Sequence, residues 1–432
     1  MRKAALLLAV LAGCGRDHGP LVRVDTEPPG VNCPDGGVAV NTGRDDNGNG
    51  VVDDGEIETT SYVCGGSSPL SCDDRHSISG LITVFDSAGF AQLDGVGCID
   101  RDLVIAGVDD ANLPDLSLEV VTGGITLAGN PELTSLAGLD KITAIGGIYA
   151  VQGNVSLADI SALGKLRDGP SVIISGNDSL LDLAGLESWI DIAHNLIITN
   201  NASLRDLHGL ENLTSTTQGV LLRGNRSLAS LAALDQLRSA AAMEISGSAA
   251  TSVSLASLQK VSVTVLVNSN DALATVTFPS LATTSGIQLH NNRALTTASF
   301  PSLVVTNTLQ IQLDPMLRSV SAPHFIAATG SMELSMLPAL TTVDLTGLTT
   351  IGGALTLSGL TTLPSLAGFN TLGGISGDMT VQTCNALTSF TGLEQLEQIG
   401  GNLTIIANTN LPKPIAQAFA ARVAVGGTTT IN

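Results

Sequence analysis

The residues best suited to bind a ligand lie in an acidic segment near the N-terminus. Oxygen-bearing residues alternate along this segment, and Gly50 allows the chain to bend sharply. The ligand positions, one of them a backbone carbonyl, are Asp45, Asn47, Asn49, Val51, Asp53 and Glu56. Calcium is a hard cation that prefers many oxygen ligands, and the Glu56 carboxylate could supply two of them. The pattern therefore predicts a structural calcium-binding loop.

The spacing matches the calcium loop of EF-hands at every specified position. The flanks do not resemble EF-hand helices, because residues 36–43 are glycine-rich and strand-like and residues 58–64 favour extended structure. The segment is similar to short acidic, Cys-bounded modules of exported bacterial proteins, and we assign this module to residues 32–66. The alternative is an acidic, turn-rich spacer that binds nothing specific.

The first residues indicate export. Residues 1–13 combine a basic start with an apolar run too short to span a bilayer, as in a signal peptide. The sequence Leu-Ala-Gly-Cys that ends at Cys14 resembles the lipobox of bacterial lipoproteins. This resemblance implies a lipid anchor on Cys14, and Gly15 implies sorting to the outer membrane, with exposure on the cell surface or towards the periplasm. An ordinary secretory signal with a chance cysteine is the alternative.

The remaining N-terminal cysteines suggest two disulfides in an exported chain. We pair Cys33 with Cys64 and Cys72 with Cys98 because they are close in sequence, although four cysteines allow three connectivities. The turn formers of residues 14–31 predict a tether. Residues 67–100 combine a strand-like segment with a short helical one and are expected to form an N-terminal cap.

Sequence motifs for catalysis and nucleic-acid binding are absent. The 6 histidines are scattered, and the sequence has no His-Glu-x-x-His motif, no Walker loop and no Gly-x-Ser-x-Gly nucleophile elbow. The net charge of -20 opposes binding to nucleic acid by general electrostatics. We expect a protein that is not an enzyme and has no nucleic-acid partner.

A repeat of 22 to 24 residues positions the rest of the chain, over residues 101–411. Apolar residues lie five and three positions before a marker position and three after it, as Ile125, Leu127 and Leu133 do around Asn130. The marker positions are Asn130, Asn154, Asn177, Asn201, Asn225, Ser248, Asn270, Asn292, Asp314, Leu337, Leu360, Cys384 and Asn408. The two-residue spacing predicts a short strand, and the three-residue spacing that follows does not fit the 3.6-residue period of an α-helix, so we expect short extended segments and turns there.

The repeats predict a mainly β protein, a right-handed parallel β-solenoid with N- and C-terminal caps. Residues 412–432 form the C-terminal cap, with a helix followed by a last strand. The marker Asn is expected to bond backbone groups of adjacent turns, and the Gly that often precedes it suggests a positive φ. These coils resemble the leucine-rich-repeat-like units of receptor L domains and related bacterial surface repeats.

The resemblance implies that Cys384 is a buried structural thiol, since leucine-rich repeats accept Asn or Cys at this position; a reactive thiol is the alternative. The outward sheet positions are polar and nearly uncharged, apart from a candidate ligand face at Ile173, Ile197, Leu221 and Arg223. Our leading hypothesis is a non-catalytic surface lipoprotein that binds a protein or a glycan. The alternatives are a purely structural envelope protein and a carbohydrate-active enzyme.

Overall fold

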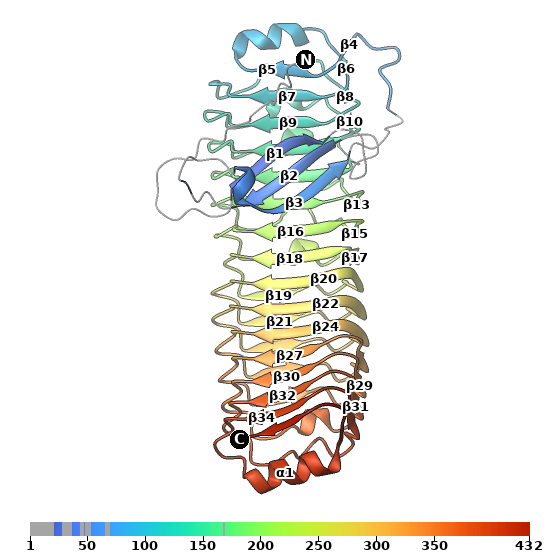
Figure 1. Ribbon diagram of the computed structural model, residues 1–432. Helices are drawn as coiled ribbons and strands as arrows, with labels where there is room; N and C mark the ends of the chain where they lie inside the picture. The colour runs from blue at the N-terminus through green and yellow to red at the C-terminus, as the bar shows by residue number, and fades with distance from the viewer. Residues whose placement is uncertain (1–20, 28–36, 44–46, 48–52, 65–69, 167–168) are drawn as a thin grey trace. The chain divides into compact units, whose positions relative to one another are not determined.

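The apolar residues before each marker form short parallel strands that stack into a β-solenoid (Figure 1). The structure is a computed structural model that describes residues 21–27, 37–43, 47, 53–64, 70–166 and 169–432. Ile125 and Leu127 point into the coil and are fully buried, and Leu133 is 1% exposed. The predicted mainly β, parallel solenoid is confirmed. The chain divides into two units, Met1–Ser227 and Leu228–Asn432.

The first unit carries the earlier coils in two parallel sheets. The longer strands that end near the markers are β5 (Ile82–Val84), β7 (Leu103–Ala106), β9 (Ile125–Ala128), β11 (Ile148–Gln152), β12 (Ser171–Ser175), β14 (Leu196–Thr199) and β16 (Gly219–Arg223). The shorter strands are β4 (Ser77–Ser79), β6 (Cys98–Asp100), β8 (Val120–Val121), β10 (Ala144–Ile145), β13 (Asp191–Ile192) and β15 (Ser215–Thr216).

The second unit repeats this arrangement and adds a third parallel sheet. Its main strands are β18 (Ala242–Ser246), β20 (Lys260–Asn268), β22 (Thr283–His290), β24 (Val305–Gln312), β27 (Met332–Ser335), β30 (Leu355–Ser358), β32 (Met379–Gln382), β34 (Leu403–Ile406) and β36 (Thr429–Ile431). The shorter ones are β17 (Ser239–Ala240), β26 (Ala327–Ala328), β29 (Thr350–Ile351), β31 (Gly374–Ile375), β33 (Gln398–Ile399) and β35 (Ala424–Val425). The added sheet contains β19 (Ser252–Ser254), β21 (Thr275–Thr277), β23 (Thr297–Ser299), β25 (Ser319–Ser321) and β28 (Thr342–Asp344).

Short segments of 3-10 helix close several coils where apolar residues recur every third position. In such a helix residues three apart lie on one side, so that side faces the core. The turns are η2 (Ser87–Leu93), η3 (Ala137–Leu139), η4 (Ser161–Leu163), η5 (Ala232–Leu234) and η6 (Ala367–Phe369). In the coil after Asn177, which lacks such a turn, Leu180, Leu183 and Leu186 still point inward and are at most 1% exposed.

The asparagines at the marker positions form a buried hydrogen-bond ladder in the first unit. Asn177 is fully buried, and its Oδ1 accepts hydrogen bonds from the backbone N–H of Asn154 at 3.1 Å and from its Nδ2 at 3.2 Å. Its own Nδ2 donates to the carbonyl of Val151 at 2.9 Å and to Oδ1 of Asn201 at 3.2 Å. Each amide therefore satisfies backbone groups that stacking would otherwise leave unpaired.

The residue before each marker has a left-handed backbone, as the recurrent glycines predict. Gly129, Gly153 and Gly176 have φ of 61°, 63° and 66°. Other coils place larger residues in this conformation, including Leu313 at 59° and Met336 at 53°. A residue with a Cβ atom pays about 1–2 kcal/mol for this backbone, so these two positions carry strain.

Residues 21–64 contain a separate antiparallel sheet with the order β1-β2-β3. Its strands are β1 (Leu21–Glu27), β2 (Gly37–Gly43) and β3 (Ile57–Cys64). The extended flanks of the acidic segment are thus confirmed. The tether expected over residues 14–31 overlaps β1, because alternating apolar and polar residues from Val22 to Asp25 fit the two-residue period of a strand.

Both ends of the solenoid continue its strand pairing. β5 pairs in parallel with β7, and β36 with β34, so residues expected as caps also contribute coils. The predicted C-terminal helix is α1 (Lys413–Arg422). Phe419 of α1 stacks on Phe390 with ring centroids 4.0 Å apart, and Arg422 donates to the Leu393 carbonyl at 2.6 Å. The helix therefore covers the last coils with both apolar and polar contacts.

Replacing Asn177 by Ala should destabilise the first unit by about 2–4 kcal/mol, because the Asn154 N–H and the Val151 carbonyl would remain buried without partners. Denaturant unfolding of the full chain measures this change. Asn212→Ala is the control, since Asn212 is exposed and donates one hydrogen bond, to the Glu187 carbonyl. An equal effect of the two substitutions would contradict the ladder's structural role.

Candidate functional site

Three of the predicted calcium ligands lie within hydrogen-bonding distance of one another. Glu56 accepts hydrogen bonds from the backbone N–H of Asn47 at 3.1 Å and of Asp53 at 2.9 Å, one on each carboxylate oxygen. The Asn47 amide donates to the Asp53 carboxylate at 2.7 Å. The short helix η1 (Asp54–Glu56) turns the chain back so that the end of the segment meets its beginning. Asp45, Asn49 and Val51 lie outside the described residues.

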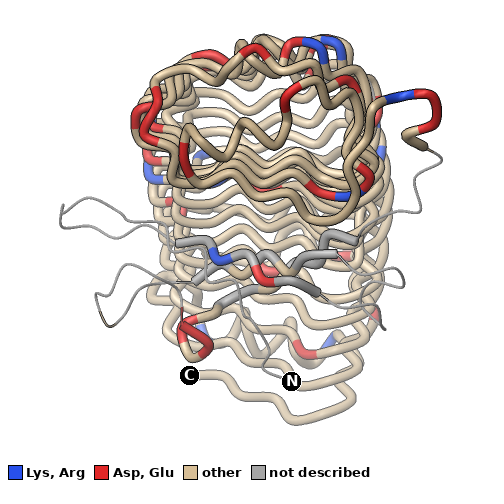
Figure 2. The backbone as a smooth tube through the Cα atoms, turned by 90° about the horizontal axis from the view of Figure 1, so that it is seen from above, with Lys and Arg blue, Asp and Glu red and all other residues tan. Residues whose placement is uncertain are grey.

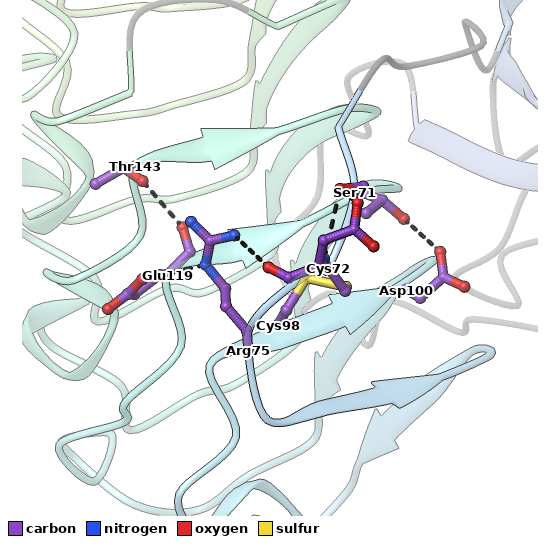
Figure 3. The surroundings of a disulfide bond; sticks show 9 residues. Ser71, Cys72, Arg75, Cys98, Asp100, Glu119 and Thr143 are labelled. Carbon is purple, nitrogen blue, oxygen red and sulfur yellow. Dashed lines mark hydrogen bonds and ion pairs between the residues drawn. A yellow bond between two sulfur atoms is a disulfide. The ribbon is translucent and has the colours of Figure 1, made fainter.

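The Cys72–Cys98 disulfide is confirmed (Figure 3). It joins the segment before β4 to the start of β6, and Cys98 is fully buried. Arg75 reaches from the same segment to the Glu119 carboxylate at 3.2 Å, while the Glu119 carbonyl accepts a hydrogen bond from Thr143. These contacts hold the segment against successive coils. Cys14 and Cys33 lie outside the described residues.

The apolar ligand face predicted in the first unit is contiguous but not open. Ile173 pairs in register with Ile197, and Ile197 with Leu221, on adjacent strands. However, Ile173 is only 1% exposed and Ile197 only 5%, and both cluster with Ala150. Every residue of β12 and β14 is buried, so both faces of these strands are covered. Ile173 and Ile197 are therefore buried, and Arg223, beside them, is half-buried; the ligand face itself stays a prediction.

The corresponding face of the second unit is polar and partly exposed. Glu333 on β27 accepts hydrogen bonds from Gln310 at 2.9 Å and from Ser335 at 2.7 Å. The other outward carboxylate, Glu244, is separated from Glu333 in the same row by Leu266, Gln288 and Gln310. Four strand steps of about 4.8 Å place these carboxylates roughly 19 Å apart.

Charged residues outside this face gather on the turns of the coils (Figure 2). His290 lies on the outward face, and burial lowers its pKa, although Glu244 acts in the opposite direction. A neutral imidazole adds no positive charge to the face. The face is thus a hydrogen-bonding surface with little net charge of its own.

A groove of about 710 Å³ follows the turns beside this face in the second unit. One side is formed by the residues that directly follow β20, β22, β24, β27 and β30, and the other by residues two positions later. The lining residues are Ser269, Asp271, Asn291, Arg293, Leu313, Pro315, Met336, Pro338 and Gly359. Its size lies within the range of ligand pockets in proteins.

The groove has an apolar half and a polar half. Leu313 and Met336 are 40% and 60% exposed, beside Pro315 and Pro338. At the other end, the exposed side chains of Arg293 and Asp271 form an ion pair at 3.5 Å. The repeat pattern did not predict this groove, although the sequence contains a signal for it: Leu and Met replace the small residue before the marker in two successive coils.

Cys384 lies in the core, as its place in the repeat implied. It is 3% exposed, and its Sγ lies 3.6 Å from the Leu357 carbonyl, where a marker Asn would place its amide. Its backbone N–H donates to Asn408 at 2.8 Å. Burial raises the pKa of the thiol to about 11, which keeps it protonated at neutral pH.

Comparison with known proteins identifies one segment. Residues 20–64 match a family model described as a domain of unknown function, DUF7151. The match coincides with the three-stranded sheet of β1, β2 and β3. No solved structure matches the chain. Among the described residues, no helix is long and apolar enough to cross a membrane.

The folded protein should protect Cys384 from alkylation at pH 8, because the thiol is buried and protonated. The same reagent should label it fully in denaturant. Mass-spectrometric mapping of the peptide that contains Cys384 measures the modification without interference from other cysteines. Rapid labelling of the folded chain would instead identify a reactive thiol.

Proposed function

We propose that the protein is a non-catalytic binding scaffold whose ligand site is the groove of the second unit. The observation that carries this proposal is the pair of large apolar residues, Leu313 and Met336, held at left-handed positions and left exposed. Glycine occupies the equivalent position in other coils, such as Gly359 at φ 67°, so the fold alone does not require these side chains. Strain retained at an exposed position is typical of ligand sites.

The chemistry of the groove favours a protein over a glycan. The apolar lining consists of aliphatic, Met and Pro side chains, and exposed methionines adapt to varied peptide side chains. The chain's charge of -20 favours a basic partner, which it would attract over a distance of about one Debye length. We therefore assign the groove to an extended apolar segment of a basic protein.

The outward carboxylates support a non-catalytic role. Glycosidases place two carboxylates about 5–9.5 Å apart. Glu244 and Glu333 are separated by three intervening strands of the same sheet and therefore lie much farther apart than that. Two further proposals concern location: Cys14 carries a lipid anchor, and the anchor holds the solenoid at the outer membrane, at the cell surface.

The double substitution Leu313→Gly and Met336→Gly should abolish most binding without loss of stability. Removing two apolar contacts should weaken binding by roughly 2 kcal/mol, about thirtyfold. Glycine removes the strain of the left-handed backbone in the folded chain, which is stabilising. This gain should offset the loss of stability that comes from the greater flexibility of glycine in the unfolded chain. The probes are basic peptides with an apolar centre, acidic peptides of the same length, and matrix polysaccharides, measured by calorimetry with the full mature chain.

Ile326→Ala is the matched control, because Ile326 is 49% exposed in the same unit but does not line the groove. We expect this variant to bind the basic peptides as the wild type does, and binding to weaken with added salt. Equal binding by wild type and double variant would contradict the groove as the site. Binding of polysaccharide alone would favour a glycan ligand, and binding of no probe would favour a purely structural envelope protein. Release of reducing ends from polysaccharide would show an enzyme.

We propose in addition that the acidic segment binds calcium and stiffens the N-terminal sheet. The positions of Asn47, Asp53 and Glu56 support this proposal, because the three residues lie close together, as the ligands of a calcium loop must. Their oxygens would serve as ligands, Glu56 with both, in place of the hydrogen bonds they now make.

Calorimetric titration of the full mature chain with calcium should show binding in the range of about 10⁻⁴ to 10⁻³ M, as in extracellular modules. Glu56→Gln should remove the heat, because an amide cannot bind calcium through two oxygens. Glu58→Gln, two residues further along and outside the ligand pattern, is the control. Equal binding by the wild type and Glu56→Gln would reject the loop as the site.

A further inference from the structure

Asp314 occupies the marker position of its coil, whereas the two preceding coils have asparagine there. Its side chain is fully buried. Oδ1 accepts hydrogen bonds from the backbone N–H of Asn292 at 2.6 Å and from its Nδ2 at 3.2 Å. Oδ1 therefore accepts the same two hydrogen bonds as the side-chain carbonyl oxygen of a marker asparagine.

The second oxygen, Oδ2, stands where an asparagine has its amide NH₂ group. In the two preceding coils this group donates to a neighbouring backbone carbonyl, from Asn270 to Ile245 and from Asn292 to Val267, at 3.0 Å each. Both acceptors lie three residues before the preceding marker. By the same rule the acceptor opposite Asp314 is the carbonyl of Leu289. Oδ2 is buried and has no hydrogen-bond partner among the described groups.

We propose that Asp314 is a proton-binding site: the folded chain holds this carboxyl group in its neutral form, and its O–H donates to the Leu289 carbonyl. The proton supplies the donor that every marker asparagine supplies with its amide. An ionised carboxylate would leave two oxygens facing each other in a site from which water is excluded, which is unfavourable for both.

The surroundings of Asp314 favour the neutral form. Burial raises its pKa to about 7, and the hydrogen bonds from Asn292 lower it only in part. The neighbouring strands and turns carry the charged or titratable residues Asp271, Arg293, His290, Arg318 and Glu333. Asp271 and Arg293 are exposed and paired, Arg318 is exposed, and His290 and Glu333 lie on the outward sheet face. Among the described residues, no charged side chain contributes to the shift.

The direction of the effect on stability follows from the two states of the chain. The unfolded chain releases this proton near the ordinary pKa of 3.8, whereas the folded chain keeps it up to about pH 7. The contribution of the proton to stability is therefore complete below about pH 3.8, declines as the pH rises, and is lost above about pH 7. Many surface carboxylates also titrate, so only the difference from a matched variant is informative.

The test compares thermal unfolding of the full chain and of Asp314→Asn from pH 5 to pH 8.5. The amide has its donor at every pH, so the variant's midpoint should rise relative to the wild type by about 4 °C or more between the two limits. Glu397→Gln, at an exposed carboxylate of the same unit, should leave the profile parallel to the wild type. Parallel profiles for wild type and Asp314→Asn would overturn the proposal.

Infrared spectroscopy of the wild type gives a second measurement that does not depend on how the variant folds. A protonated-carboxyl band should persist at pH 6 in the folded chain and disappear as the pH rises through about 7. Where Asp314→Asn folds, the band should be missing from its spectrum. Absence of the band from the folded wild type at pH 6 would overturn the proposal as well.

Discussion

The hydrogen bonds of the buried marker side chains are the interaction on which each stack of coils depends. The backbone groups of parallel strands form hydrogen bonds with the neighbouring strands. The turn that follows each strand, however, leaves a backbone N–H and a carbonyl inside the core without a backbone partner. In the first unit, Asn154 and Asn177 pair both groups with a side chain and link each coil to the next at 2.9–3.2 Å. The amide of Asn has a donor and an acceptor on separate atoms of a short side chain, so it can bond a backbone N–H and a carbonyl at the same time, which explains its recurrence.

The ladder also dictates what its neighbours can do. Because the marker side chain must turn inward, the residue before it has a left-handed backbone and points its side chain outward. Gly129 and Gly359 meet this demand without strain, whereas Leu313 and Met336 meet it at a cost and gain an exposed apolar surface. The left-handed residues before the markers thus form a row of outward positions where the size of the side chain can vary without disturbing the core. The groove occupies such a row.

The repeat made the core predictable, because its periodicity reports directly on which residues face inward. Ile125, Leu127, Leu133 and Cys384 are buried as expected. The surface was less predictable, since alternation distinguishes the two faces of a strand but not whether the outer face is open. Ile173 and Ile197 do point away from the coil, yet they are covered. The groove escaped prediction for a related reason, because it is formed by turn residues from five coils, and no window of sequence contains them together.

Some coils have another residue in place of the marker asparagine. These replacements show whether a coil can lose the hydrogen-bond donor of the asparagine side chain, its acceptor, or both. Leu337 and Leu360 lack a donor and an acceptor, and their coils rely on apolar packing. Cys384 keeps a weak donor and places its sulfur beside the Leu357 carbonyl. Asp314 keeps the acceptor and loses the donor unless it carries a proton. Leu313 and Pro315, its neighbours in the chain, line the groove, so the marker that we propose to bind a proton lies beside the proposed ligand site. A change in the protonation of Asp314 would therefore act on the turn that carries Leu313.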